Sequence, residues 1–249
     1  QYKLLSTELG ILSYSHIGNL SDLEKAINSA EPLNPSDSFS RTMNSPRQAV
    51  QHELTSARAY WKANLRNELQ LNVSRQYNKR QEFDRSIFSD LQVADLQYEI
   101  TTYQADIQYE DRIRSNYKYE IGIASETQAN TYTGRFFIPN FRNYTVGLFT
   151  IHHLNFGAWE LEGGVRYDYK WQEAFMYRQN ELYSPIRTFD GISSNIGVSR
   201  EWKKWVAMFN AGRAWRSPSI NELYSEGLHH GVAAVEFGVE TLDEERMTS

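Results

Sequence analysis

Polar and apolar side chains alternate along much of this chain. In the segment WELEGGVRYDYKWQ, residues 159–172, one set of alternate positions is apolar and the other is mostly charged. The apolar set is Trp159, Leu161, Val165, Tyr167, Tyr169 and Trp171, and the charged set is Glu160, Glu162, Arg166, Asp168 and Lys170. Because successive side chains of a strand point to opposite faces, this pattern predicts a strand with one apolar and one polar face.

The same alternation recurs at residues 67–77 and 117–126, and it changes phase within residues 96–109. The apolar positions there are first Leu96, Tyr98 and Ile100, and then Tyr103, Ala105, Ile107 and Tyr109. One extra residue in a strand has this effect on the pattern. We therefore expect a β-bulge near Thr101 and Thr102.

The connections between the expected strands alternate in length. Short ones fall at about residues 63–67, 112–116, 155–158 and 201–204, and longer polar ones at about 18–47, 79–91, 131–141, 176–189 and 217–249. About nine strands result, many of them about 10 to 17 residues long, where strands of globular sheets usually have about 5 to 6. Short turns at one end and long loops at the other are typical of an antiparallel up-and-down transmembrane β-barrel.

The first long connection contains one helical pattern. Leu20, Leu23, Ala26 and Ile27 have helical spacing, and Ser21 is a candidate cap, so we expect a short surface helix there. The Pro and Ser residues that follow predict an irregular segment.

The composition agrees with a barrel and excludes several other classes. The chain has 16 Tyr, 12 Phe and 6 Trp but a net charge of −5, which argues against a nucleic-acid partner. Cysteine is absent, so disulfides and thiolate metal sites are excluded. No segment has the roughly 18 apolar residues that a membrane helix needs. The first residues already have a strand pattern and no signal-peptide features, so we expect the chain to begin within a domain.

Aromatic residues lie near the expected strand ends, as at a membrane interface, where amphipathic rings prefer the headgroup level. They are Tyr60, Trp61, Trp159, Trp202 and Trp205. Soluble β-proteins place aromatic residues at strand ends too, so an alternative is a soluble β-sandwich such as a carbohydrate-binding module.

Few side chains are candidates for site chemistry. His229 and His230 could bind a metal or a haem iron, although adjacent residues of a strand point to opposite sides and a role in a polar loop is the alternative. His152 and His153 adjoin a short turn, where we expect a structural role.

Paired carboxylates do not indicate an enzyme either. Glu160 and Glu162 could be an acid/base pair, but mixed charges along a water-lined wall explain them more simply. The run from Asp243 to Arg246 is typical of a solvated loop. We therefore expect no enzyme, no resident metal and no cofactor.

The segment GRAWRSPSINELYSEGLHHG, residues 212–231, closely resembles the TonB-dependent outer-membrane receptors at the point where a barrel strand rises into an extracellular loop. The matching residues are Arg216, Pro218, Ser219, Asn221, Glu222, Leu223 and Tyr224. In the second half of the motif Gly238, Leu242 and Glu245 match, while Val239 and Glu240 replace the usual asparagine and proline. Pro218 cannot donate a ladder hydrogen bond, so the strand should end there.

The resemblance implies a barrel of twenty-two strands in the Gram-negative outer membrane, with a plug that fills the lumen and a TonB box upstream of it. Residues 1–249 are then a partial β-barrel domain from the middle of a receptor, without the plug and the C-terminal strands. The implied function is import of an iron complex, a ferric siderophore, with energy supplied through TonB.

The implied partners are the iron complex or haem, TonB through the plug, and outer-membrane lipid. Candidate ligand-binding residues are His229, His230 and Tyr224. A haem receptor is the main alternative, and cobalamin or a glycan are further alternatives.

Overall fold

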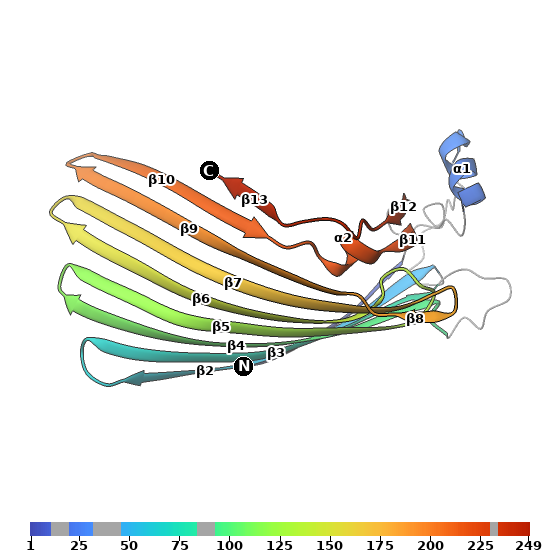
Figure 1. Ribbon diagram of the computed structural model, residues 1–249, viewed down its shortest axis with the longest axis horizontal. Helices are drawn as coiled ribbons and strands as arrows, with labels where there is room; N and C mark the ends of the chain where they lie inside the picture. Colours follow the sequence, from blue (N-terminus) through green and yellow to red (C-terminus); the bar gives the residue numbers. More distant parts are fainter. Residues whose placement is uncertain (11–19, 32–45, 84–92, 230–233) are drawn as a thin grey trace.

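One long antiparallel sheet makes up most of the molecule (Figure 1). The computed structural model describes residues 1–10, 20–31, 46–83, 93–229 and 234–249. Its long strands are β1 (Tyr2–Gly10), β2 (Arg47–Lys62), β3 (Asn67–Phe83), β4 (Leu96–Arg114), β5 (Tyr117–Gly134), β6 (Asn140–Phe156), β7 (Trp159–Arg178), β9 (Ile186–Trp202) and β10 (Trp205–Arg216).

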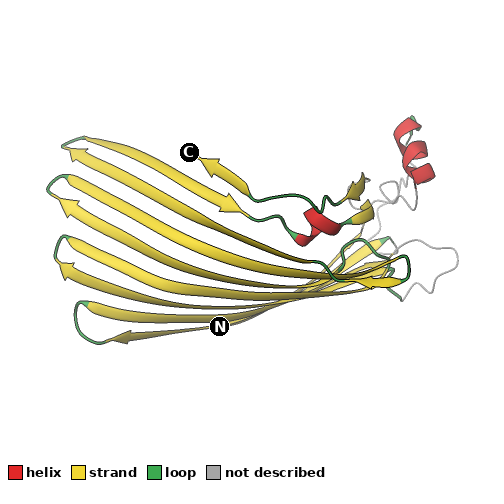
Figure 2. Cartoon of the chain, in the orientation of Figure 1, coloured by secondary structure: helices red, strands yellow, loops and turns green. Residues whose placement is uncertain are grey.

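Short elements complete the described chain (Figure 2). Strand β8 (Glu181–Tyr183) pairs with β7, β13 (Glu245–Thr248) pairs with β10, and β11 (Glu226–His229) forms a separate hairpin with β12 (Ala234–Phe237). The helices are α1 (Leu20–Asn28) and α2 (Ile220–Tyr224). Neither helix of the described residues is long and apolar enough to cross a membrane.

The order of the main sheet is β1-β2-β3-β4-β5-β6-β7-β9-β10-β13, so each long strand lies beside its neighbour in sequence. This meander confirms the expected up-and-down architecture and the nine long strands. A sandwich would need a second large sheet packed on the first, and the only other sheet in the described residues is the β11–β12 hairpin. The β-sandwich alternative is therefore wrong.

The turns are segregated by length, as expected. Tight turns join β2 to β3, β4 to β5, β6 to β7 and β9 to β10 at one end, and all longer connections lie at the other end (Figure 1). We call these the turn end and the loop end. In the turn before β3, Asn64 Oδ1 accepts hydrogen bonds from the backbone N–H groups of Arg66 at 2.7 Å and Asn67 at 3.0 Å. A short polar side chain thus closes a turn whose backbone groups lie outside the ladder.

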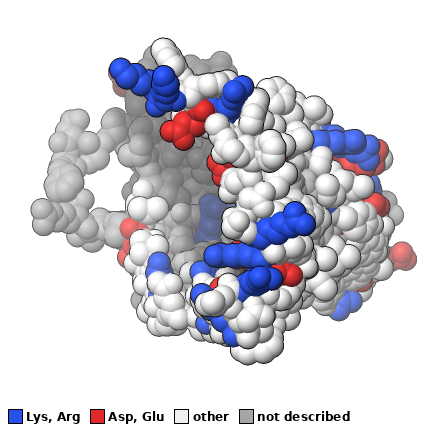
Figure 3. All heavy atoms as spheres, turned by 90° about the vertical axis from the view of Figure 1, so that its left-hand side faces the viewer, with Lys and Arg blue, Asp and Glu red and all other residues white. Residues whose placement is uncertain are grey.

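The two faces of the sheet differ in chemistry. On the outer face Ile107, Ile123 and Leu148 are 48%, 50% and 54% exposed. On the inner face polar side chains bind one another across strands: Arg58 Nε donates to Asn72 Oδ1 at 2.5 Å, and Asn72 Nδ2 donates to Asp106 Oδ2 at 2.6 Å. An apolar exterior around a polar interior is the arrangement of a membrane barrel. Seen from the turn end, the molecule is hollowed, with charges of both signs (Figure 3).

The expected bulge near Thr101 and Thr102 is wrong. Strand β4 keeps continuous register with β3 and β5 through both residues, and its register shift with β5 lies between Asp111 and Arg114. The pattern changes phase because the apolar side chains change face. Leu96 and Tyr98 are buried on the inner face, 3% and 8% exposed, whereas the set that begins at Tyr103 lies on the outer face. The inner face at the loop end therefore carries apolar as well as polar side chains.

Helix α1 spans Leu20–Asn28, which confirms the helix expected from the spacing of its apolar residues. Ser21 lies within the helix, one residue after its start, so it is not the cap. The irregular segment expected after the helix lies mostly outside the described residues.

Candidate functional site

Strand β10 ends where Pro218 removes a backbone donor, and the chain then folds back over the inner face of the sheet as α2. The Glu222 carboxylate holds the start of this helix: it accepts from the Ser219 backbone N–H and from Ser219 Oγ, both at 2.7 Å. Arg216 binds the same carboxylate at two points, Nη1 to Oε2 at 2.8 Å and Nη2 to Oε1 at 2.9 Å. These hydrogen bonds, first those from Arg216 and then those from Ser219, lower the pKa of Glu222 to about 2.

The apolar side of α2 packs into the inner face at the loop end. Ile220, Leu223 and Tyr224 are 3%, 0% and 5% exposed. They form a buried cluster with Ala174, Met176 and Phe189 of β7 and β9. Gln172 Nε2 donates to the Pro218 carbonyl at 2.9 Å and ties the chain just before α2 to β7. Burying each large apolar side chain contributes about 1.5–3 kcal/mol, so α2 is a packed part of the wall.

The segment after the β11–β12 hairpin lies against α2. Gly238 N–H donates to the Ser225 carbonyl at 2.7 Å, and Val239 N–H donates to the Glu222 carbonyl at 2.8 Å. A Cβ on Gly238 would lie 2.4 Å from the Leu223 carbonyl carbon and from the Tyr224 nitrogen. Only glycine allows this approach of the two backbones.

Glu240 holds the same segment against residues of β7 and β8. Its carboxylate is paired with Arg178 and accepts from the Tyr183 hydroxyl at 2.9 Å. Arg187 donates to the carbonyl groups of Glu240 and Leu242, the latter at 3.0 Å. The hydrogen bond to Glu240 raises the pKa of Tyr183. Residues 217–245 outside the hairpin tip are thus clamped at several points, and we call them the fold-back.

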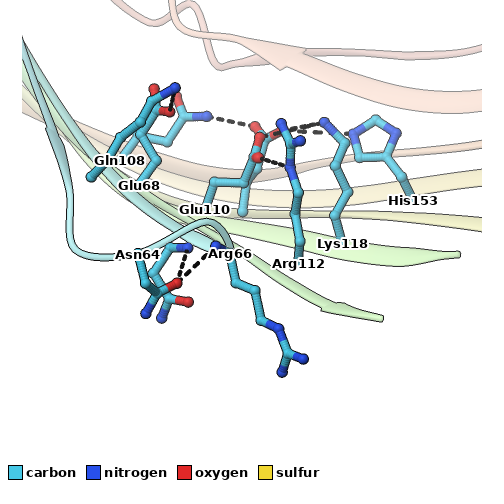
Figure 4. A network of polar contacts seen from close by, with 11 residues as sticks. Asn64, Arg66, Glu68, Gln108, Glu110, Arg112, Lys118 and His153 are labelled. Atoms are coloured by element: carbon cyan, nitrogen blue, oxygen red, sulfur yellow. Dashed lines mark hydrogen bonds and ion pairs between the residues drawn. The ribbon is translucent and has the colours of Figure 1, made fainter. Parts of the chain in front are cut away.

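A second polar region lines the inner face near the turn end (Figure 4). Arg112 Nε donates to Glu110 at 2.7 Å, and Lys118 lies between Glu110 at 3.5 Å and Glu120 at 3.1 Å. His153 lies 3.8 Å from Glu120 and 3.2 Å from Glu162. Farther along the wall Arg166 binds Asp168. These contacts form the mixed-charge wall that the alternating pattern predicts.

The TonB dependent receptor-like β-barrel family matches residues 8–249, nearly the whole chain. This chain belongs to the TonB-dependent receptors. The family consists of outer-membrane transporters of Gram-negative bacteria rather than enzymes, which agrees with the sequence analysis. The inner face described above is therefore the lumen wall of a barrel, and the outer face meets lipid.

Solved structures also match this chain. The FrpB iron transporter from Neisseria meningitidis matches in its F3-3 variant with a TM-score of 0.54 at 16% identity, over 70% of this chain and 29% of that one. Its F5-1 variant matches with a TM-score of 0.54 at 15% identity, over 74% and 32%.

A double mutant of the Serratia marcescens hemophore receptor HasR, in complex with its hemophore HasA and heme, matches at a TM-score of 0.46 and 14% identity, over 82% of this chain and 39% of that one. No curated protein matches the sequence. At these identities the likeness to the FrpB structures shows the fold alone. The chain spans about a third of the matched structures.

The candidate ligand-binding residues of the receptor lie in different places. Tyr224 belongs to the buried cluster between α2 and the inner face of the sheet. His229 ends β11, where its backbone pairs with Ala234 at the tip of the hairpin, and His230 lies outside the described residues. A ligand contact by these three residues stays a prediction. In the described residues no group of three or more His, Asp or Glu side chains could hold a metal ion.

His152, next to His153, also contacts neighbours at the turn end. His152 lies on the lipid-facing side, where Tyr117 and Tyr119 stack on it with ring centroids 6.2 Å away, and its Nδ1 lies 2.9 Å from the Tyr117 hydroxyl oxygen. Trp61, Trp159 and Trp202 also lie at this end, and Arg200 covers the last two rings at 4.7 and 4.4 Å. This placement is that of an interface girdle.

Sequence reasoning missed the residues that hold the fold-back. Gln172 fits the charged and polar row of β7 without any sign that it reaches Pro218, and Arg178 and Arg187 occur in an ordinary polar loop region. One signal was present at Glu240, which departs from the family motif and proves to be the clamp residue.

Proposed function

We propose that this chain is part of the barrel of an outer-membrane receptor that imports an iron complex, a ferric siderophore, with energy supplied through TonB. The family match over residues 8–249 carries the proposal. The FrpB iron transporter, which shares the fold, supports iron as the cargo. The polar lumen wall and the loops at one end are the surfaces with which such a barrel would contact its ligand.

We further propose that residues 1–249 belong to a longer receptor whose other strands close the barrel around a plug. In the described residues β1 pairs only with β2, and β13 pairs only with β10. Open edges present unpaired backbone groups, which a membrane barrel satisfies by closure. Contact with TonB would then pass through the plug.

A haem receptor is the second candidate, because His229 lies at the tip of the β11–β12 hairpin at the loop end. Neutral imidazole is a common axial ligand of haem iron. In that case one of the two adjacent histidines would reach an iron presented to the loop end.

Binding to the receptor in detergent tests both candidates. The receptor is titrated with ferric siderophores and with haem, with Trp fluorescence and the haem Soret band as readouts. We expect saturable quenching by a ferric siderophore, unchanged in a variant with His229 and His230 replaced by Ala. A variant with His152 and His153 replaced by Ala is the matched control, because that pair lies at the turn end.

A Soret shift that is lost only in the 229/230 variant would establish haem as the ligand instead. Absence of binding by any ferric siderophore and by haem would contradict an iron complex as the cargo.

A further inference from the structure

Arg200 lies on the outer face at the turn end, two residues before the end of β9. Trp159, the first residue of β7, is directly opposite Arg200 in the ladder, and Trp202 follows it on the same face. The guanidinium carbon of Arg200 lies 4.7 Å from the ring centroid of Trp159 and 4.4 Å from that of Trp202. The arginine is therefore part of the aromatic girdle, at the level where lipid headgroups meet the barrel.

No acidic side chain of the described residues neutralises Arg200. Glu160 and Glu201 are adjacent in sequence to Trp159 and Arg200, so they point to the opposite face, toward the lumen. The two rings attract the cation through their π faces but offer no hydrogen-bond acceptor. Of the three guanidinium nitrogens, Nε alone is buried without a partner, so Nη1 and Nη2 are open to the membrane. Their acceptor must therefore come from the surroundings of the barrel.

Arg142, on the same face but nearer the loop end, has a different environment. Its guanidinium carbon also lies over two rings, 5.7 Å from the centroid of Trp171 and 5.4 Å from that of Phe175. In addition, Glu173 binds it at two points, with Oε2 at 2.7 Å from Nε and at 2.6 Å from Nη2. The protein thus supplies a counter-charge for Arg142 but none for Arg200.

The turn between β9 and β10 adds two further cations. Lys203 and Lys204 are exposed, and neither has an ion pair within the described residues. They lie between Trp202 and Trp205, which are opposite each other in the ladder and 42% and 78% exposed. Lysine stems can follow an apolar surface while the ammonium groups reach the headgroup level. This corner of the outer face therefore combines three cations with three indole rings.

We propose that Arg200, Lys203 and Lys204 bind the phosphate of an anionic phospholipid such as phosphatidylglycerol. Arg200 donates from its Nη groups to phosphate oxygens, the lysines add charge, and the indole rings pack against the glycerol backbone and the upper acyl chains. In barrels of this kind the tight turns are periplasmic, so the lipid belongs to the periplasmic leaflet. The proposal rests on membership of the family and not on the cargo of the receptor.

Native mass spectrometry of the whole receptor, released from a neutral detergent, tests this site. The receptor is incubated with equal amounts of phosphatidylglycerol and phosphatidylcholine that have the same acyl chains. The readout is the ratio of receptor with one bound phosphatidylglycerol to receptor with one bound phosphatidylcholine. We expect a ratio of at least about five, because each basic residue near the headgroups favours an anionic lipid about fivefold.

Three variants locate the binding. Arg200→Gln should lower the ratio about fivefold. Arg66→Gln is the matched control and should change it less than about twofold, because Arg66 is exposed in another tight turn without a ring contact to hold it. A protein with both Lys203→Gln and Lys204→Gln should also lower the ratio about fivefold, and this test remains if Arg200→Gln folds poorly, since both lysines are exposed in the turn.

Two results would overturn the proposal. One is equal retention of the two lipids by the wild-type receptor, which would show no preference for an anionic headgroup. The other is an equal change in Arg200→Gln and Arg66→Gln, which would show a general attraction of the turn end for anions rather than a site at the girdle. Neither result bears on the import of iron, which is measured with a different ligand.

Discussion

Arg216 and Glu222 form a two-point ion pair across the end of β10, with N–O distances of 2.8 and 2.9 Å. The same arginine also contacts Glu245 of β13 at 2.9 Å. One side chain therefore joins the last residue of a barrel strand, the fold-back helix and the returning strand. Three residues of the family motif thus have a structural role in the folding of the loop.

Glu222→Gln should loosen the fold-back by about 1 kcal/mol, because the pair is partly exposed and the substitution removes one charge. Limited proteolysis of the fold-back measures this as cleavage about fivefold faster. Glu245→Gln is the control, since Glu245 is the more exposed partner of Arg216 and its loss should matter less. Equal cleavage of wild type and both variants would contradict the role of the pair.

The stability of the fold-back should fall in acid. The folded pKa of Glu222 is about 2, below the ordinary value of 4.5. A carboxyl group whose pKa is lowered in the folded state stabilises that state at pH values above the ordinary pKa. This contribution is lost as the pH falls from about 4.5 toward 2. Proteolysis by pepsin across this window should show faster cleavage at lower pH in the wild type after correction for enzyme activity, and a weaker pH dependence in Glu222→Gln.

Gly238→Ala should destabilise the fold-back by about 1–3 kcal/mol, because the new methyl group would lie 2.4 Å from backbone atoms of α2. Gly212→Ala is the matched control, since its nearest non-neighbour atom would lie 3.5 Å from the new carbon. Proteolysis and thermal unfolding compare the two variants. Equal effects would show that the contact with α2 is not what requires glycine at position 238.

Tyr224→Phe should weaken ligand binding if the predicted ligand contact is made by the hydroxyl, because the substitution removes the hydroxyl and keeps the ring of the buried cluster. Tyr224→Ala should destabilise the protein by about 3–5 kcal/mol through the cavity it creates. Ligand titration and unfolding of both variants separate the two roles. A loss of affinity in a well-folded Tyr224→Phe protein would identify the hydroxyl as a ligand contact.

Ile123→Arg should hinder insertion into lipid by about 2–4 kcal/mol, because Ile123 lies on the outer face in the middle of β5. Ala124→Arg, one residue farther on the lumen face, should have a much smaller effect. Refolding into lipid vesicles in a urea series measures both. Similar losses for the two variants would contradict the assignment of the faces.

The alternation of polar and apolar residues was enough to predict the meander, the tight turns and the two faces, because each of these depends on local periodicity and turn chemistry. It misled at Leu96, Tyr98 and Ile100. Their phase looks like an insertion in the sequence, whereas the cause is that these three side chains face the lumen, in a cavity to which the fold-back contributes. That contribution comes from residues more than 100 positions away.

The site was less predictable for the same reason. Glu240 holds Arg178 and Tyr183, which are 62 and 57 residues distant, and Gln172 reaches Pro218 across 46 residues. No local pattern encodes such partners. The motif from Arg216 to Tyr224 could be recognised, but its role in packing α2 into the wall became visible only in three dimensions.

We propose that the whole receptor imports an iron complex, and uptake of radioactive iron by cells that express the receptor tests this proposal most directly. We expect accumulation of iron supplied as a ferric siderophore, lost when TonB is deleted and reduced in Gly238→Ala relative to Gly212→Ala. Uptake that is the same with and without the receptor, for every ferric siderophore and for haem, would contradict the claim.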